Sequence, residues 1–342
     1  MQLTVRELCG DELPLWDELV AVSPQRTIFA QRWWMEIVTD GQARLLGCFN
    51  GNRLVAGLPV WECRYLGVRR LRQPPLTPYW GPLLRPLDGK PQTRANAEMH
   101  VLRALAEALA PWPDITMQWH HSLANWLPFY WNGFNQMTRY TYRIADLSDL
   151  ARVEKACHDA VGQQLRRARR DGLHYEDMVD PEIVGRLNRL SMARQGVART
   201  PEIDRLWPAL ARAAGERDCL FTTAAIDNDS HVHAAMAMMW DDRCAYALFN
   251  GADPAYHGSY GSTLTLWREI EYAAGVVPEF DFEGSIVEPV EQFYRRFSGV
   301  LSPFMLVTRA RSLRLNLARA AQRVLRRAGK RTDQASRANT SG

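Results

Sequence analysis

The expected helices and strands follow the same order twice along the chain, and this repeat limits the folds that are possible. In each half, a helical stretch precedes a β-hairpin, and a loop, a helix and a strand come after it. Strands that alternate with helices favour sheets covered by helices over all-α or all-β folds. We therefore expect an α/β protein with mixed (α+β) sheets, built from two similar domains that meet near residues 145–150.

The first half contains a strong hairpin signal. Asn50-Gly51-Asn52 separates two apolar runs, and Asn-Gly in this position is typical of a tight turn between antiparallel strands. Helical periodicity places Phe29, Trp33 and Ile37 on one face of a helix. The elements expected here are strands over 3–8, 43–49, 53–61 and 114–119, helices over 12–22, 29–38 and 93–109, and a Pro-rich segment over 73–86.

The second half repeats this order. The turn from Asp227 to Ser230 separates two apolar runs and predicts another hairpin. Gly172 ends the first helical pattern of this half. The elements expected here are helices over 151–171, 181–194, 262–274 and 288–297, and strands over 220–226, 232–239, 244–250 and 279–282.

Composition excludes a fibrous or disordered chain, since 46% of the 342 residues are hydrophobic and 23% are charged. The six cysteines are scattered without metal-ligand spacing, which fits a reducing compartment. The first residues carry acids where a signal peptide would be apolar, and no run approaches the ~20 apolar residues of a membrane span. We expect a cytoplasmic protein, either free or peripheral at the inner face of the membrane.

Positive charge is concentrated near the carboxy terminus. Residues 309–331 contain nine Lys or Arg and no Asp or Glu, and the remaining chain has 33 basic and 38 acidic residues, a net charge of −5. This asymmetry favours an anionic partner for the segment rather than a nucleic-acid-binding body. Leucines and alanines fall on one side of Arg311–Arg331, so this helix either lies on anionic lipid or docks on the body.

These observations give the expected domain boundaries. We expect an amino-terminal domain over 1–147, a carboxy-terminal domain over 148–308, a basic amphipathic helix over 309–331 and a disordered tail over 332–342.

A Gly-rich loop precedes the helix expected from Ser262. Free N–H groups and the positive end of a helix dipole suit a pyrophosphate or carboxylate, although a turn capped by Ser262 needs no ligand. The candidate residues for binding such a ligand are Asn250, Gly258, Ser259, Tyr260, Gly261, Ser262 and Thr263.

Two carboxylates end the last strand expected in the second half. Asp281 and Glu283 are two residues apart, so in a continuous strand they share one face. One of them could deprotonate an amine nucleophile, or both could form a solvated strand end. With Tyr294 on the following helix, they are the candidate catalytic residues.

Basic and aromatic side chains supply candidate substrate contacts. Arg166 belongs to a run of four arginines, and Arg295 and Arg296 follow Tyr294; each could bind an anionic group or form a solvated face. Tyr79 and Trp80 lie in the Pro-rich segment, where an ordered aromatic loop lines a pocket or packs between domains. The histidine pairs 120–121 and 231/233 lack the spacing of a metal site, and we assign them to structure.

Together, these segments resemble the Fem-type branch of the GNAT acyltransferase superfamily, which includes the peptidoglycan-bridge aminoacyltransferases. The resemblance covers about residues 1–308 and is strongest over 244–300. The segments that carry it are IFAQRWWMEIV (28–38), RLVAGLPVWECRYLGVRRLRQPPLTPYWGP (53–82), QQLRRARRDGL (163–173), ALFNGADPAYHGSYGSTLTLWREIEYAAG (247–275) and FDFEGSIVEPVEQFYRRFSG (280–299).

The resemblance implies tandem GNAT-like domains and transfer of an acyl or aminoacyl group to an amine. Acyl-CoA or aminoacyl-tRNA would be a donor substrate rather than a bound cofactor, and Tyr294 stands where bridge-forming enzymes commonly carry Lys. The acidic body favours acyl-CoA over tRNA. The acceptor is expected to be a small or lipid-linked amine of cell-envelope metabolism. An inactive GNAT-like protein bound to a membrane by its tail is the alternative from another functional class.

Overall fold

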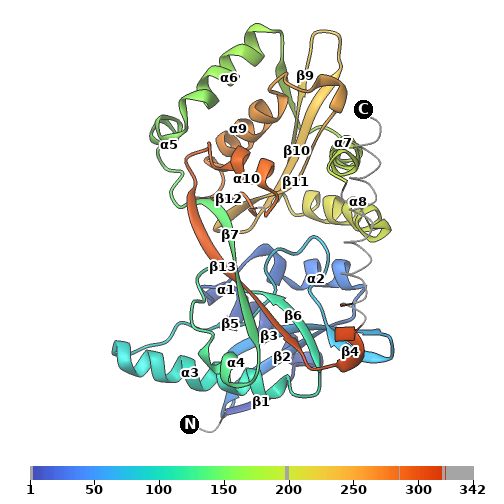
Figure 1. Ribbon diagram of the computed structural model, residues 1–342. Coiled ribbons are helices and arrows are strands. Elements are labelled where there is room, and N and C mark those ends of the chain that lie inside the picture. Colours follow the sequence, from blue (N-terminus) through green and yellow to red (C-terminus); the bar gives the residue numbers. More distant parts are fainter. Residues whose placement is uncertain (1–2, 197–199, 285, 318–319, 321–342) are drawn as a thin grey trace.

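The computed structural model in Figure 1 describes residues 3–196, 200–284, 286–317 and 320. Its strands are β1 (Leu3–Glu7), β2 (Ala43–Asn50), β3 (Arg53–Tyr65), β4 (Val68–Leu71), β5 (Leu83–Leu84), β6 (Asp114–Gln118), β7 (Asn135–Ile144), β8 (His174–Asp177), β9 (Leu220–Ile226), β10 (Val232–Trp240), β11 (Cys244–Ala252), β12 (Glu279–Asp281) and β13 (Val300–Ala310).

The helices cover this sheet in both halves. The α-helices are α1 (Leu13–Val22), α2 (Arg32–Thr39), α3 (Pro91–Ala108), α4 (Leu127–Trp131), α5 (Leu150–Ala156), α6 (Asp159–Arg170), α7 (Pro181–Arg194), α8 (Pro201–Gly215), α9 (Gly261–Ala273) and α10 (Glu288–Tyr294). Short 3-10 turns are η1 (Gly10–Glu12), η2 (Ile28–Ala30) and η3 (Pro254–Tyr256).

Within the described residues, thirteen strands form one sheet. Its order is β1-β2-β3-β4-β6-β13-β7-β12-β11-β10-β9-β8, with β5 paired to β3. All pairs are antiparallel except β4 with β6 in the first half and β11 with β12 in the second. The mixed sheet and its helices confirm the expected α/β class.

Two long strands hold the halves together, as Figure 1 shows where β7 and β13 cross between them. They pair from Thr308↔Asn135 to Val300↔Arg143. At one end β13 also pairs with β6 of the first half, and at the other end β7 pairs with β12 of the second. The boundary expected near 145–150 lies directly after β7, and the domain division itself stays a prediction.

Sequence periodicity did not predict β7 or β13. Pro303 lies in the middle of β13 opposite Tyr140, and a proline within an apolar run argues against a central strand because it lacks an N–H. In β7, exposed and buried residues do not alternate strictly. Helix α4, helix α8 and the short strands β4, β5 and β8 were also not predicted.

Three other expectations need correction. The helix expected over 151–171 is broken into α5 and α6, because Cys157 is extended and His158 Nδ1 accepts the N–H of Ala160 as a cap. The helix over 29–38 is η2 followed by α2, with Gln31 extended between them. The carboxy-terminal helix begins only at residue 313.

Arg309 was counted with that basic helix, but it lies in β13 and is buried. Its guanidinium donates to the carbonyl oxygens of Leu109 and Trp112 and lies 4.5 Å from the ring centre of Phe134. Residues 318–319 and 321–342, which include most of the expected helix and all of the expected disordered tail, lie outside the described residues.

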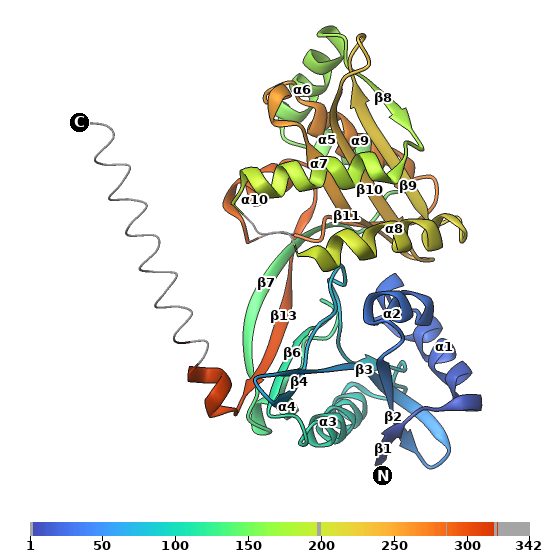
Figure 2. The same ribbon diagram turned by 90° about the vertical axis from the view of Figure 1, so that its right-hand side faces the viewer.

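The two halves pack through a shared apolar core. The ring of Phe29 lies 5.0 Å from Trp34 and 4.8 Å from Tyr246 of β11. Figure 2 shows α7 and α8 on one face of the second half's sheet, with α6 and α9 on the other. Among the described residues, no helix has the length and apolar character needed to cross a membrane.

Candidate active site

The parallel strands β11 and β12 separate after three paired residues, and a pocket lies beside that separation. Tyr246↔Asp281 is the last pair, because β12 ends there while β11 continues to Ala252. The pocket encloses about 520 Å³. It is lined by Ser191, Arg194, Gln195, Met236, Asn250, Gly251, Ala252, His257, Ser262, Val287, Pro289, Val290, Phe293 and Tyr294.

Side chains of α7 bind the edge of β11 beyond the last pair. Asn188 Nδ2 donates to the carbonyl oxygen of Asn250 at 2.7 Å, and the N–H of Ala252 donates to Ser191 Oγ at 2.8 Å. Since the N–H and C=O of one residue point to the same side of a strand, the Asn250 N–H faces this edge too. That N–H therefore points toward the separation.

The loop before α9 contains two residues in the left-handed region of backbone conformation. Gly258 and Tyr260 have left-handed φ angles of 91° and 65°. A Cβ on Gly261 would lie 3.1–3.3 Å from neighbouring Cβ atoms, so a glycine lets this first turn pack closely on the sheet. Ser262, in the first turn of α9, lines the pocket, whereas the N–H groups of Gly261 and Thr263 already bond Ser259 Oγ and the Tyr260 carbonyl oxygen.

Other residues of the loop before α9 make protein contacts. Ser259 Oγ accepts the N–H of Gly261 at 3.3 Å, and Thr263 Oγ1 donates to Gln164 of α6 at 2.9 Å. Thr263 thus ties α9 to α6, while Asn250 and Ser262 line the pocket.

Tyr294 and Asn250 meet at the inner wall of the pocket. Asn250 Nδ2 donates to Tyr294 Oη at 3.0 Å. Burial raises the pKa of Tyr294, and the nearby charges of Glu283 and Glu269 raise it further. The phenol is therefore protonated at neutral pH and can act as a donor.

Two carboxyl groups lie close to Tyr294. Burial raises the pKa of Glu283 well above its ordinary range, and the charges of Asp281 and Glu269 add to this. Glu269, on α9, is fully buried, and neither of its carboxyl oxygens has a hydrogen-bond partner within the described part of the chain. Its pKa is likewise raised well above the ordinary range by burial. Sequence analysis missed Glu269, since a glutamate in a helix usually faces water.

Asp281 holds the two halves together rather than lining the pocket. It accepts hydrogen bonds from Tyr79 Oη at 2.8 Å, Thr141 Oγ1 at 2.6 Å and the Glu283 N–H at 2.8 Å. Burial raises its pKa, and the Thr141 and Tyr79 hydrogen bonds oppose that rise. The shared face expected for Asp281 and Glu283 is not formed, because β12 ends at Asp281 and Glu283 has a left-handed φ of 58°.

The expected substrate residues do not gather at the pocket. Tyr79 and Trp80 are buried, and Trp80 pairs with Gln118 beside β6. Arg166 is exposed on α6, and Arg295 is exposed and forms an ion pair with Glu291 at 3.7 Å.

Arg296 offers its carbonyl oxygen to the His158 N–H. The arginine that does line the pocket is Arg194, at the end of α7. In the sequence it looks like any basic residue in the last turn of a helix, so it was not predicted as a site residue.

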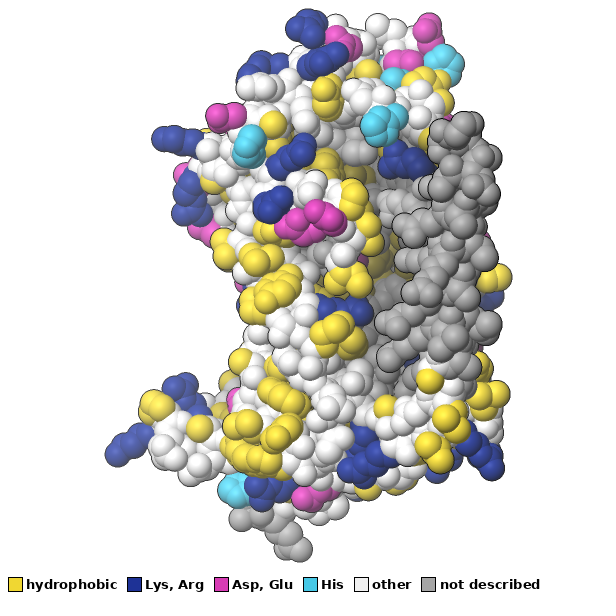
Figure 3. All heavy atoms as spheres, viewed as in Figure 1, with side chains coloured by type: hydrophobic (Ala, Val, Ile, Leu, Met, Phe, Trp, Pro, Cys, Tyr) yellow, Lys and Arg dark blue, Asp and Glu magenta, His cyan; other side chains and the backbone are white. Residues whose placement is uncertain are grey.

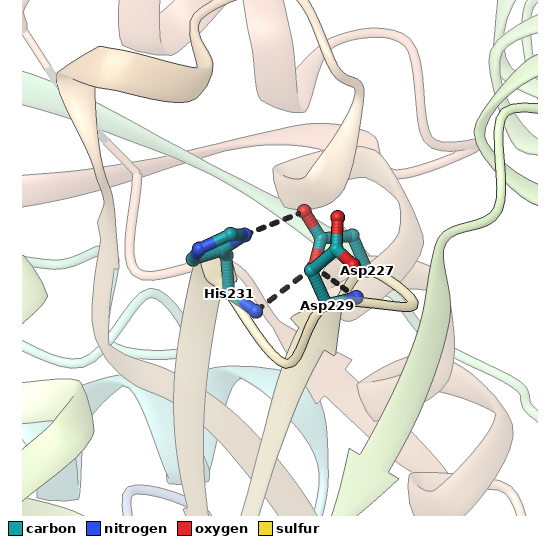
Figure 4. Close-up of side chains that lie close together, drawn as sticks. All are labelled: Asp227, Asp229 and His231. Carbon is teal, nitrogen blue, oxygen red and sulfur yellow. Dashed lines mark hydrogen bonds and ion pairs between the residues drawn. The ribbon is translucent and has the colours of Figure 1, made fainter.

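A group that could hold a cation lies in the β9–β10 turn (Figure 4). Candidate ligand atoms of Asp227, Asp229 and His231 lie within 4.8 Å of one another. Asp227 already accepts the N–H groups of Asp229 and His231 at 3.0 and 2.9 Å and contacts His233 Nε2 at 3.1 Å. These contacts shape the turn. They give His231 and His233 the hydrogen-bond partners expected of residues with a structural role.

Comparison with known proteins gives a family for the second half. Residues 155–286 match the acetyltransferase (GNAT) domain. No curated protein matches the chain.

Solved structures share the fold over nearly the whole chain. FemX is 11% identical with a TM-score of 0.61, covering 89% of this chain and 97% of its own. A tandem GNAT protein from the clavulanic acid biosynthesis pathway is 13% identical (TM-score 0.54; 90% and 98% covered). A conserved protein of unknown function from Bacteroides thetaiotaomicron is 13% identical (TM-score 0.55; 90% and 99% covered). The match of residues 155–286 agrees with the expected GNAT domain and acyltransferase class, and the solved structures confirm the expected fold.

Proposed function

We propose that this chain, which has a GNAT domain over residues 155–286 and shares its fold with FemX and a tandem GNAT protein, transfers an acyl group from acyl-CoA to an amine. The observation that carries the proposal is the pocket beside the separated strands β11 and β12. It has a helix N-terminus on one side and Asn250 with Tyr294 on its inner wall. A diphosphate, a carbonyl and a leaving group would each find a suitable partner there.

In this proposal the donor's phosphates bind at Gly258–Ser262, and the N–H of Asn250 polarises the thioester carbonyl. The amine nitrogen attacks the carbonyl carbon, the C–S bond breaks, and an amide and a thiolate form. Glu283, in its ionised form, takes the proton that the amine loses. Tyr294 donates a proton to the thiolate and is reprotonated by the proton that Glu283 has taken, so the products are an amide and free CoA.

Aminoacyl-tRNA acting on a peptidoglycan precursor is the second candidate. The exposed arginines of α6 favour it, because Arg167 lies 5.5 Å from the ring centre of Tyr260 in the loop before α9. The positive charge of two of the four α6 arginines is partly neutralised, since Arg167 and Arg170 each lie 3.5 Å from Asp171. The acceptor in either case is an amine, and we propose one from cell-envelope or polysaccharide metabolism.

Thermal melting with and without acetyl-CoA and longer acyl-CoAs tests the donor. A ligand at 100 times its dissociation constant adds about 2.7 kcal/mol. With an unfolding entropy of about 2.1 cal/mol/K per residue, 342 residues give about 0.7 kcal/mol/K. We therefore expect a rise of about 4 °C.

Gly258→Asp places a negative charge in the loop before α9, where the phosphates are proposed to bind, and should abolish that rise. Gly67→Asp is the matched control, because Gly67 also has a left-handed φ and open space around it. If no acyl-CoA raises the melting temperature of the wild type, acyl-CoA is not the donor, and charged tRNA is tested next.

A further inference from the structure

Helix α4 has apolar side chains on both of its faces. Pro128 and Phe129 are buried, whereas Leu127, Tyr130 and Trp131 are 46%, 57% and 54% exposed. Leu127 is three and four residues from the other two, so all three share one face. Single exposed apolar residues are normal, but three on one short helix mark a contact surface. Figure 3 shows hydrophobic side chains gathered over the region of α4.

The start of the carboxy-terminal segment adjoins the end of α4. Arg311 Nη2 donates to the carbonyl oxygen of Asn132, the residue after α4, at 2.8 Å. The helix that begins at residue 313 exposes Leu313 and Leu317, four residues apart, by 72% and 63%. Both elements therefore contribute exposed apolar side chains next to one contact point.

Positive charge accompanies these apolar groups. The guanidinium of Arg103 lies 5.6 Å from the ring centre of Trp131, and Arg314 is exposed between the two leucines. Beyond them the sequence continues to residue 331 with basic residues and no acid. Tryptophan and tyrosine favour the water–lipid interface, and arginines near it attract anionic headgroups.

We propose that the exposed face of α4 and residues 311–317 form a docking surface for a membrane of anionic phospholipid. Charge complementarity argues for lipid over a second copy of the chain, because a second copy would bring its own arginines against these. Figure 2 places α10 and the start of the carboxy-terminal segment on the same side of the molecule.

A membrane on that side would bring a lipid-linked amine toward the pocket. This last step rests on the proposed function, whereas lipid binding itself does not.

Sedimentation with vesicles tests the surface in the full-length protein. We expect binding to phosphatidylglycerol vesicles and not to phosphatidylcholine vesicles, with release at high salt. Tyr130→Ser combined with Trp131→Ser should weaken binding about tenfold. Arg314→Ala should weaken it roughly fivefold. Tyr175→Ser, at an exposed tyrosine on β8, is the control and should bind like the wild type.

The outcomes separate the alternatives. Equal binding by the wild type and the double variant, or equal binding to both lipids, would overturn the proposal. A dimer in light scattering that the double variant converts to a monomer would assign the face to a second copy instead. Melting curves with acyl-CoA contain no vesicles, so failure of the donor proposal and failure of the docking proposal give different results.

Discussion

Replacing Gly251 by alanine tests how α7 and β11 form the pocket wall. A Cβ at this position would lie 2.5 Å from the carbonyl oxygen of Leu187 and would overlap the peptide bond to Asn188. These are backbone atoms of α7, so no side-chain rotation relieves the clash. The helix must shift, although Asn188 and Ser191 bind it to β11.

The loss of stability expected for Gly251→Ala follows from overpacking. Extra carbon atoms in a packed core cost about 1–3 kcal/mol. At about 0.7 kcal/mol/K for 342 residues, the melting temperature should fall by about 1.5–4 °C. Because α7 also lines the pocket, we expect the donor-induced rise in melting temperature to shrink.

Gly162→Ala is the matched control for this substitution. Gly162 lies inside α6, where the nearest atom to an added Cβ is Nη1 of Arg166 at 3.4 Å. Alanine is favoured over glycine in a helix by about 0.5–1 kcal/mol, so this variant should melt about 1 °C higher. Differential scanning calorimetry measures both. If Gly251→Ala melts at or above the wild-type temperature, α7 does not pack on β11 as described.

Three further changes have distinct expected results. Glu269→Met removes a buried carboxyl that has no hydrogen-bond partner among the described residues and should stabilise the protein by about 1–3 kcal/mol in calorimetry, while a loss of stability would show that Glu269 has one. Tyr294→Phe should lower kcat about a hundredfold in an acyl-transfer assay and keep donor binding; an unchanged kcat would remove Tyr294 from the proposed chemistry. Arg69 lowers the pKa of Glu62 from 4.5 to about 2, so this ion pair stabilises the fold above pH 4.5 and the gain is lost as pH falls toward 2. In acid unfolding, Glu62→Gln should not lose this stability between pH 4.5 and 2. A pH dependence of stability equal to that of the wild type would contradict the role of this ion pair.

Local sequence signals predicted much of the second half. The strands around the Asp227–Ser230 turn and the helix after Tyr260 lie within about two residues of expectation, because turn residues and apolar periodicity are local. In contrast, the pairing of β7 with β13 joins residues more than 150 positions apart. No local sequence pattern predicts such a pairing.

The site shows the same division. The loop before α9 could be predicted from the sequence, because its glycines lie next to the start of a helix. Asp281 and Glu283 were expected on one face, but the left-handed φ of Glu283 ends the strand alternation. Arg194 and Glu269 were missed because their roles depend on which other segments pack around them.

The crossing of β13 back to β6 has a consequence for folding during synthesis. The first half cannot complete its sheet until residues 300–310 have left the ribosome, since β13 lies between β6 and β7. For most of translation, those two strands therefore lack their central partner, which is a long-range contact and slow to form. We expect chains shortened before residue 300 to leave the edges of β6 and β7 unpaired, so that loss of the last strand damages the earliest part of the protein.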